Sequence, residues 1–146
     1  MLTYEEIRES FQEYKEKILE LIEKKIYSFE RYGIEFSTLL IYSDSPIDKK
    51  ICNTYIRQSD TVYMLEENFV LVVYDVIDPE NSIKAAQNFL HKYQNYKLKQ
   101  TMYLAVATAE QEETAIDMAS RLFIILEYAI RENLANSVID INQMRY

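Results

Sequence analysis

Few residues of this chain have types that could carry catalytic chemistry. Gly33 is the only glycine among 146 residues. Loops that hold phosphates use glycines, because the backbone must approach the ligand and adopt positive φ angles. The sequence therefore excludes a P-loop and a glycine-rich dinucleotide-binding loop. His91 and Cys52 are also the only residues of their types, which argues against a zinc site or a Cys–His nucleophile pair.

Three carboxylates near predicted chain reversals are the remaining candidates for a metal site. Asp44 follows one predicted strand, and Glu66 and Glu67 stand in a short polar break between two others. Hard cations accept carboxylate oxygens, so the three side chains could gather around one ion. A solvated acidic turn explains the same residues without a ligand. We favour that interpretation and predict neither a metal nor a cofactor.

Composition and charge narrow the class of protein. With 49% hydrophobic and 27% charged residues, the chain suits one globular domain. Its net charge of −8 argues against binding to nucleic acid or to an anionic membrane surface. No apolar run is long enough for a membrane span, and the first residues do not form a signal peptide. The single cysteine fits a reducing compartment, so we expect a cytoplasmic protein.

A predicted β-hairpin lies at the centre of the chain. Residues 61–65 and 69–74 are rich in β-branched, aromatic and aliphatic side chains, and residues 66–68 have the length of a hairpin connection. The whole order reads helix, β, α, β, β, α, β, α, β. This order predicts an α/β protein, an α+β sandwich in which helices cover both faces of a mixed sheet around a βαββαβ core. Besides the hairpin strands, we expect strands at 36–42, 101–107 and 137–141, and helices at 3–31, 45–57, from 78 and at 110–132.

The predicted N-terminal helix, residues 1–30, has two interpretations. Thr3 and Glu6 match a capping box at its start, and Gly33 ends it. Apolar residues from Ile7 to Ile18 form a narrow stripe on a strongly charged surface. Such a stripe suits a signalling or dimerisation helix that pairs with a second copy or with a partner protein. The alternative is an ordinary helix that packs on the core of its own domain.

Five segments follow one another in an order that is known from one protein family. They are Arg31-Tyr32-Gly33 with 36–41, Ile56–Val62, Phe69–Val73, Thr101–Ala107 and Tyr128–Val138. Together they resemble the GGDEF domain family, the bacterial diguanylate cyclases that join two GTP molecules into cyclic di-GMP. The resemblance implies a palm-like fold, and we interpret residues 31–146 as a GGDEF-like domain.

The departures from the family fall on residues that the resemblance implies are catalytic. The family holds two divalent cations with carboxylates during phosphoryl transfer, and Tyr42 stands at the position of the first of these ligands. The signature turn reads Leu65-Glu66-Glu67-Asn68-Phe69 here, without either of its glycines. At the C-terminal motif, Leu134 and Ala135 replace the family's Gly and Arg. We therefore expect a degenerate domain with no enzymatic activity.

One motif of the family is retained. Arg57-x-x-Asp60 is similar to the motif through which many members bind cyclic di-GMP as a product, and Arg131 keeps the charge of a phosphate-binding Lys. An arginine can grip a phosphate or a guanine edge with two donors, and an aspartate can accept from guanine nitrogens. Alternatively, Arg57 and Asp60 only cap the junction of a helix and a strand. The Arg that usually completes the site is absent from 85–89.

These observations lead to one expected function and two alternatives. We expect a catalytically inactive GGDEF-like domain that acts as a regulatory or dimerisation module in bacterial cyclic di-GMP signalling. The first alternative is a cyclic di-GMP receptor that uses Arg57 and Asp60. The second is a residual diguanylate cyclase or nucleotide hydrolase with divergent metal ligands.

Overall fold

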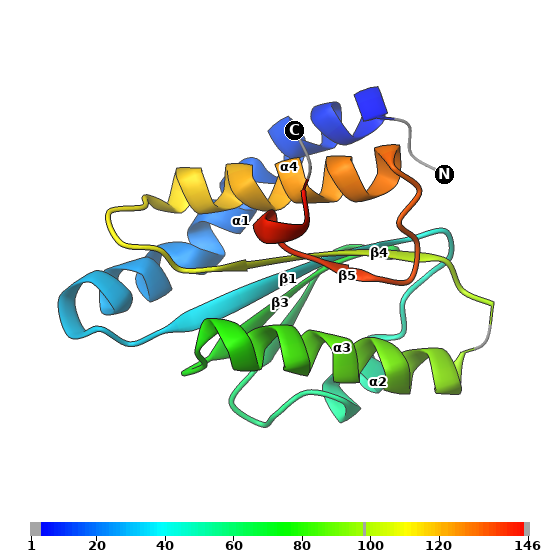
Figure 1. Ribbon diagram of the computed structural model, residues 1–146, viewed down its shortest axis with the longest axis horizontal. Helices are drawn as coiled ribbons and strands as arrows, with labels where there is room; N and C mark the ends of the chain where they lie inside the picture. Colours follow the sequence, from blue (N-terminus) through cyan, green and yellow to red (C-terminus); the bar gives the residue numbers. More distant parts are fainter. Residues whose placement is uncertain (1–3, 98, 145–146) are drawn as a thin grey trace.

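The computed structural model describes residues 4–97 and 99–144, without the side chains of residues 4, 7, 10 and 11. Within these residues, five strands form one sheet that is covered by helices on both faces (Figure 1). The order of the elements is the predicted one. In chain order they are α1 (Tyr4–Tyr32), β1 (Phe36–Ser43), α2 (Lys49–Thr54), β2 (Thr61–Glu66), β3 (Phe69–Asp75), α3 (Pro79–Tyr96), β4 (Met102–Thr108), α4 (Ala115–Arg131), β5 (Val138–Ile139) and the 3-10 helix η1 (Ile141–Gln143).

The strands lie in the order β2-β3-β1-β4-β5. The central strand β1 is antiparallel to both β3 and β4, whereas β5 is parallel to β4. Helices α2 and α3 make the crossovers from β1 to β2 and from β3 to β4. This arrangement confirms the predicted mixed sheet and the βαββαβ core.

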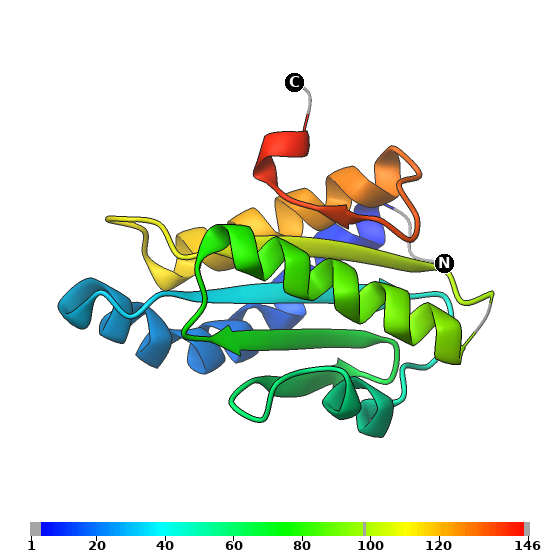
Figure 2. The ribbon, with the colours of Figure 1, turned by 60° about the horizontal axis from the view of Figure 1, so that its bottom comes forward.

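The sheet separates two hydrophobic cores. Helices α1 and α4 cover one face and α2 and α3 cover the other, as Figures 1 and 2 show from two sides. Because side chains alternate along a strand, Leu40 and Tyr42 of β1 pack towards α1 and α4, while Leu39 and Ile41 pack towards α2 and α3. All residues of β1 are buried as a result, which explains why its sequence lacks a polar face.

Helix α1 belongs to the first of these cores over most of its length. Ile18, Ile22, Ile26 and Phe29 are buried there with residues of α4 and the sheet. Gly33 ends the helix as predicted: its φ is 68° and its N–H donates to the Phe29 carbonyl at 2.9 Å. From Tyr14 onwards, α1 is therefore a core-packing helix. The predicted capping residue Thr3 and the side chains of Ile7 and Phe11 lie outside the described residues.

The predicted start and end of the second helix were wrong. Helix α2 begins at Lys49 rather than at Ser45, because Asp48 is the capping residue. The Asp48 carboxylate accepts from the backbone N–H groups of Lys50 at 3.0 Å and Ile51 at 3.3 Å. The helix also stops at Thr54, before the predicted end at residue 57.

Two boundaries near the C-terminus also differ from the prediction. Helix α4 begins at Ala115, because Thr114 and Asp117 form a reciprocal capping box and the mostly acidic residues 110–113 form the loop before it. The last strand covers only Val138–Ile139, since Asp140 caps the 3-10 helix that follows. None of the helices in the described part of the chain combines the length and the apolarity needed to cross a membrane.

Candidate functional site

A pocket of about 460 Å³ lies where the start of β2, the end of β3 and one side of α3 meet. Arg57 and Asp60, both predicted as nucleotide contacts, line this pocket. Helix α3 contributes Asn81, Asn88 and Lys92, whose spacing along the chain places them on one face of the helix. The structure thus brings the retained motif together with polar side chains of a different element.

The Asp60 carboxylate accepts hydrogen bonds from Arg57 and from the backbone of Asp75. The Nε and Nη2 atoms of Arg57 donate to its two oxygens at 3.1 and 2.9 Å. The backbone N–H groups of Arg57 and Asp75 donate to the same carboxylate, each at 3.0 Å. Since Asp60 is also buried, its first role is to cap the junction between α2 and β2 and to hold the end of β3 beside it. We refer to Arg57, Asp60 and Asp75 as the Arg57 clamp.

Arg57 itself remains accessible from the pocket. Its side chain is 49% exposed, although its Nη2 also donates to the Asp75 carbonyl. Its pKa is raised, first by the hydrogen bond to Asp60, so the guanidinium stays charged at any relevant pH. The pocket consequently presents a positive charge whose geometry is held rigidly by the clamp.

Tyr74 lines the same pocket and carries an unusual hydroxyl. The side chain is 2% exposed, and no hydrogen-bond partner for the hydroxyl occurs among the described residues. Burial, and next the charge of Asp60, raise the pKa of Tyr74, so the hydroxyl keeps its proton. Buried polar groups are normally paired. The Tyr74 hydroxyl is therefore a donor without an acceptor beside the pocket.

Arg131, the third predicted nucleotide contact, lies at the other end of the sheet. Its guanidinium stacks over the Tyr128 ring at 5.6 Å and pairs with Glu132 at 3.4 Å. Helix α4 ends there, next to the loop that bonds to the start of β4 through Asn136. The structure therefore does not bring Arg131 together with Arg57 and Asp60.

The strand register shows how far apart these two ends are. Phe36, at the start of β1, pairs with Asp75 of the clamp, whereas Ser43, at the end of β1, pairs with Met102 of β4. A strand rises roughly 3.3 Å per residue, so the two ends are about 20 Å apart. A nucleotide of ordinary size cannot reach Arg57 and Arg131 at once.

The hairpin turn lies at the same end of the sheet as Arg131. The carboxylates of Asp44 and Glu66 at this end bind different partners. Asp44 accepts from the Thr101 N–H at 3.1 Å, and Glu66 accepts from the Tyr14 hydroxyl. Tyr42 is buried and packs edge-on against Phe69, with ring centroids 6.2 Å apart. In the part of the chain that the structure describes, no group of three or more His, Cys, Asp or Glu residues could hold a metal ion.

Backbone bonds close this end of the sheet. The Ser43 N–H donates to the Asn68 carbonyl at 3.0 Å, and the Ile47 N–H donates to the Glu67 carbonyl at 2.8 Å. The Asn68 side chain donates back to the Ser43 carbonyl at 3.2 Å. Buried Gln100 adds bonds to the carbonyls of residues 45 and 46 at 3.1 and 3.2 Å. Segment 43–47 is thus fastened onto the turn.

Comparisons with known proteins identify the fold. No family model matches the sequence, and no curated protein matches it. Among solved structures, the chain is similar to the GGDEF domain of YfiN (also called TpbB) from Pseudomonas aeruginosa, with a TM-score of 0.69 at 13% identity over 83% of this chain and 91% of that one. The chain has a GGDEF-like fold.

Two further structures share this GGDEF-like fold. The active GGEEF domain of a diguanylate cyclase from Vibrio cholerae matches with a TM-score of 0.67 at 14% identity, over 88% of this chain and 97% of that one. The coiled coil and GGDEF domain of DgcB from Caulobacter crescentus, solved in complex with cyclic di-GMP, matches with a TM-score of 0.66 at 10% identity, over 83% and 77%. At 10 and 14% identity, these two matches show a shared fold.

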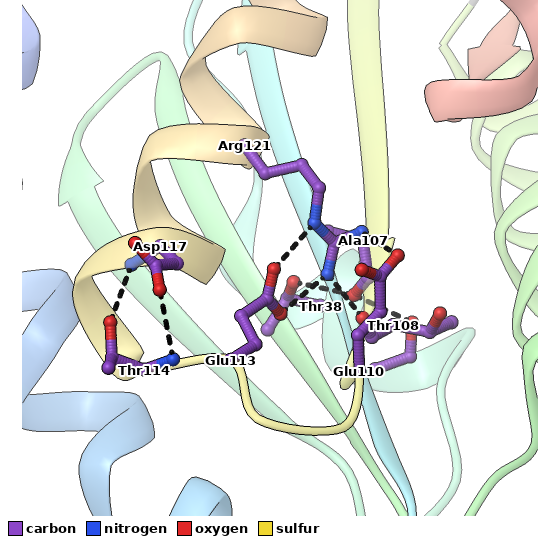
Figure 3. A network of polar contacts seen from close by, with 9 residues as sticks. Thr38, Ala107, Thr108, Glu110, Glu113, Thr114, Asp117 and Arg121 are labelled. Carbon is purple, nitrogen blue, oxygen red and sulfur yellow. Dashed lines mark hydrogen bonds and ion pairs between the residues drawn. The ribbon is translucent and has the colours of Figure 1, made fainter.

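The GGDEF-like domain also contains a buried ion pair that the sequence did not suggest. Figure 3 shows Arg121 of α4 pointing towards Glu113 in the loop after β4. The Arg121 Nε and Nη2 atoms donate to the two Glu113 oxygens at 2.9 and 2.7 Å, and Nη2 also donates to the Thr108 carbonyl. The two side chains are 13% and 9% exposed. This pair fixes the β4–α4 loop.

Sequence reasoning also missed the part of the pocket formed by other elements. Asn88 and Lys92 of α3 and the hydroxyl of Tyr74 were not among the predicted site residues. Polar residues at helical spacing on α3 were a usable signal. The spacing did not predict that these α3 residues lie beside Arg57, because their position depends on how α3 crosses the sheet.

Proposed function

We propose that this GGDEF-like domain is catalytically silent and acts as a regulatory or dimerisation module in bacterial cyclic di-GMP signalling, in the cytoplasm. The observation that carries the proposal is the fastening of segment 43–47 onto the hairpin turn. Phosphoryl transfer needs backbone donors and metal ions at the transferring phosphate. Here the N–H groups of Ser43 and Ile47 are already bonded to the turn.

The residues at this end do not fit the metal ions that the family's chemistry requires. Tyr42 fills the first ligand position with a buried ring. Asp44 and Glu66 are each bonded to a different part of the chain. Two glutamates in the turn place negative charge where a triphosphate would have to lie, which repels it. No step of the cyclase reaction can be assigned to these side chains.

Binding of substrate is the first test of catalytic silence. We expect calorimetry with a non-hydrolysable GTP analogue and magnesium to show no binding to the full chain. Magnesium-dependent binding that disappears in Glu66→Gln would contradict the proposal. Arg57→Ala, changed at the other end of the sheet, is the matched control in that case.

The N-terminal end of α1 is the proposed contact with a second copy or a signalling partner. Its first turns lie beside α4, where Arg8 pairs with Glu127 at 3.9 Å, and the described side chains from Glu5 to Glu13 are exposed. We expect light scattering of the full chain to find a dimer. A monomer at all concentrations would contradict pairing with a second copy, and only contact with a different signalling protein would remain.

Binding of cyclic di-GMP is the second candidate function, and the pocket at Arg57 favours it. Its volume, about 460 Å³, falls within the range of small-molecule sites. Arg57 and Lys92 supply its positive charges beside the carboxylates of Asp60 and Asp78, and the Asn88 amide could read a base edge. Arginine recognises phosphate with paired donors, which suits a dinucleotide.

Calorimetry with cyclic di-GMP tests this second function. We expect binding to the full chain that is lost in Arg57→Ala and weakened in Lys92→Ala. Arg131→Ala should bind as the unmodified chain does, because Arg131 lies at the opposite end of the sheet. Equal loss in the Arg57 and Arg131 variants would point to general charge attraction rather than to this pocket.

A further inference from the structure

Asp75, the last residue of β3, is the member of the Arg57 clamp that also contacts helix α1. Its side chain forms an ion pair with Lys25 of α1, with an Nζ to Oδ1 distance of 2.5 Å. Its backbone N–H donates to Asp60 at 3.0 Å, and its backbone carbonyl accepts from Arg57. A single residue is thus held by α1 through its side chain and by the clamp through its backbone.

The residue after Asp75 has a strained backbone. Val76 has a φ of 45°, in the left-handed region that β-branched residues avoid, and it is 70% exposed. The contacts of Asp75 hold it on one side. On the other side, the Ile77 N–H donates to the Glu35 carbonyl at 3.2 Å. Val76 also lines the pocket, so the conformation of segment 75–77 and the shape of the pocket depend on the same contacts.

The charge of Asp75 acts on Arg57 as well. The Asp60 hydrogen bond and the Asp60 charge raise the pKa of Arg57 against the opposing effect of burial, and the nearby Asp75 carboxylate adds a smaller rise. Lys25 offsets this carboxylate from the side of α1. Without Lys25, the negative charge of Asp75 would compete with an anionic ligand for the guanidinium.

We propose that Lys25 is a positioning residue for the pocket. Through its ion pair with Asp75, it makes the affinity of the Arg57 clamp for a phosphate-bearing ligand depend on the position of α1. This inference rests on the second function proposed above. It gives a signal that moves α1 a physical route to the pocket, and by thermodynamic reciprocity a bound ligand favours the α1 position seen here.

The first part of the test is calorimetry of the full chain with cyclic di-GMP. Allosteric couplings commonly change affinity by about 5-fold or more, so we expect Lys25→Met to weaken binding by that factor. Lys25→Arg keeps the charge and should bind as the unmodified chain does. Lys24→Met removes the same charge from an exposed position on α1 and should have no effect. Adding Asp75→Asn to Lys25→Met should restore affinity, because the uncompensated carboxylate is then gone.

The second part needs no ligand. Hydrogen exchange of the Asp75 and Ile77 amides reports whether the clamp holds segment 75–77, and we expect faster exchange in Lys25→Met alone. If the chain binds cyclic di-GMP but Lys25→Met changes neither affinity nor exchange, the coupling is overturned. If the unmodified chain does not bind cyclic di-GMP while exchange still quickens only in Lys25→Met, the receptor function fails and the link from Lys25 to the clamp is supported.

Discussion

Arg121 and Arg57 make the same type of ion pair but have different roles. Both make paired donor contacts to one carboxylate, to Glu113 and Asp60 respectively. The Arg121 side chain is 13% exposed, whereas Arg57 is 49% exposed. Arg121 also pairs with Glu110 at 3.5 Å, so its mostly covered guanidinium is held between two carboxylates, and we assign it a structural role. The half-exposed Arg57 can also meet a ligand. Exposure, which the sequence does not report, separates the two roles.

Replacing Arg121 tests the structural role. Removing one partner of a buried ion pair leaves an unpaired charge, so Arg121→Met should lower the free energy of unfolding by about 3 to 5 kcal/mol. Lys84 pairs with Glu80 on the surface of α3 at 3.5 Å, and Lys84→Met should cost less than about 1 kcal/mol. Urea unfolding measures both. Equal effects in the two variants would show that the Arg121 pair is not buried in solution.

Cys52 gives a prediction on pH. Burial raises the pKa of its thiol from 9.0 to about 12. The unfolded chain therefore loses the thiol proton before the folded chain does, and the stability that the neutral thiol contributes falls as the pH rises from 9 towards 12. We expect the free energy of unfolding to decrease between pH 8 and pH 10, and to decrease less in Cys52→Ala. An identical decrease in both proteins would contradict the assignment to Cys52.

At the scale of elements, the order of helices and strands was predictable and several boundaries were not. Apolar patterns and the single glycine place each element, because burial on a sheet face or a helix face dictates those patterns. The start of a helix depends instead on which of several polar residues caps it. The sequence analysis started this helix at Ser45, whereas the structure caps it with Asp48, after Ile47 has bonded to the turn.

The two possible caps of α2 can be compared directly. Asp48→Ala removes the acceptor of two N–H groups and should cost about 1 kcal/mol of stability. Ser45→Ala should change stability by no more than about 0.5 kcal/mol, because the Ser45 side chain caps nothing. Thermal unfolding of the two variants measures the difference. A larger loss of stability in Ser45→Ala than in Asp48→Ala would indicate that the helix starts at Ser45, as the sequence pattern predicts.

The candidate site was predictable only in part. Arg57 and Asp60 were visible in the sequence as a spaced motif. The neighbouring contributions of Tyr74, Lys92 and Lys25 were not, because they come from three elements that meet only in the folded sheet. The sequence analysis grouped Arg131 with the motif because of its charge, but Arg131 lies at the opposite end of the sheet.

On the scale of the whole molecule, the two ends of the sheet have different properties. One end holds the pocket, the Arg57 clamp and the link to α1 through Lys25. The other end, which carries the hairpin turn, is closed by backbone bonds from Ser43 and Ile47. For this GGDEF-like domain we therefore propose that ligand binding belongs to the first end and that the second end is catalytically silent.

The most direct test of this account is a turnover measurement with the full chain. The chain is incubated with GTP and either magnesium or manganese, beside an active diguanylate cyclase as a positive control, and the nucleotides are separated by chromatography. The account predicts unchanged GTP, with neither cyclic di-GMP nor GDP above the level without protein. Product that accumulates with time and with protein concentration, and that Glu66→Gln abolishes, would contradict it.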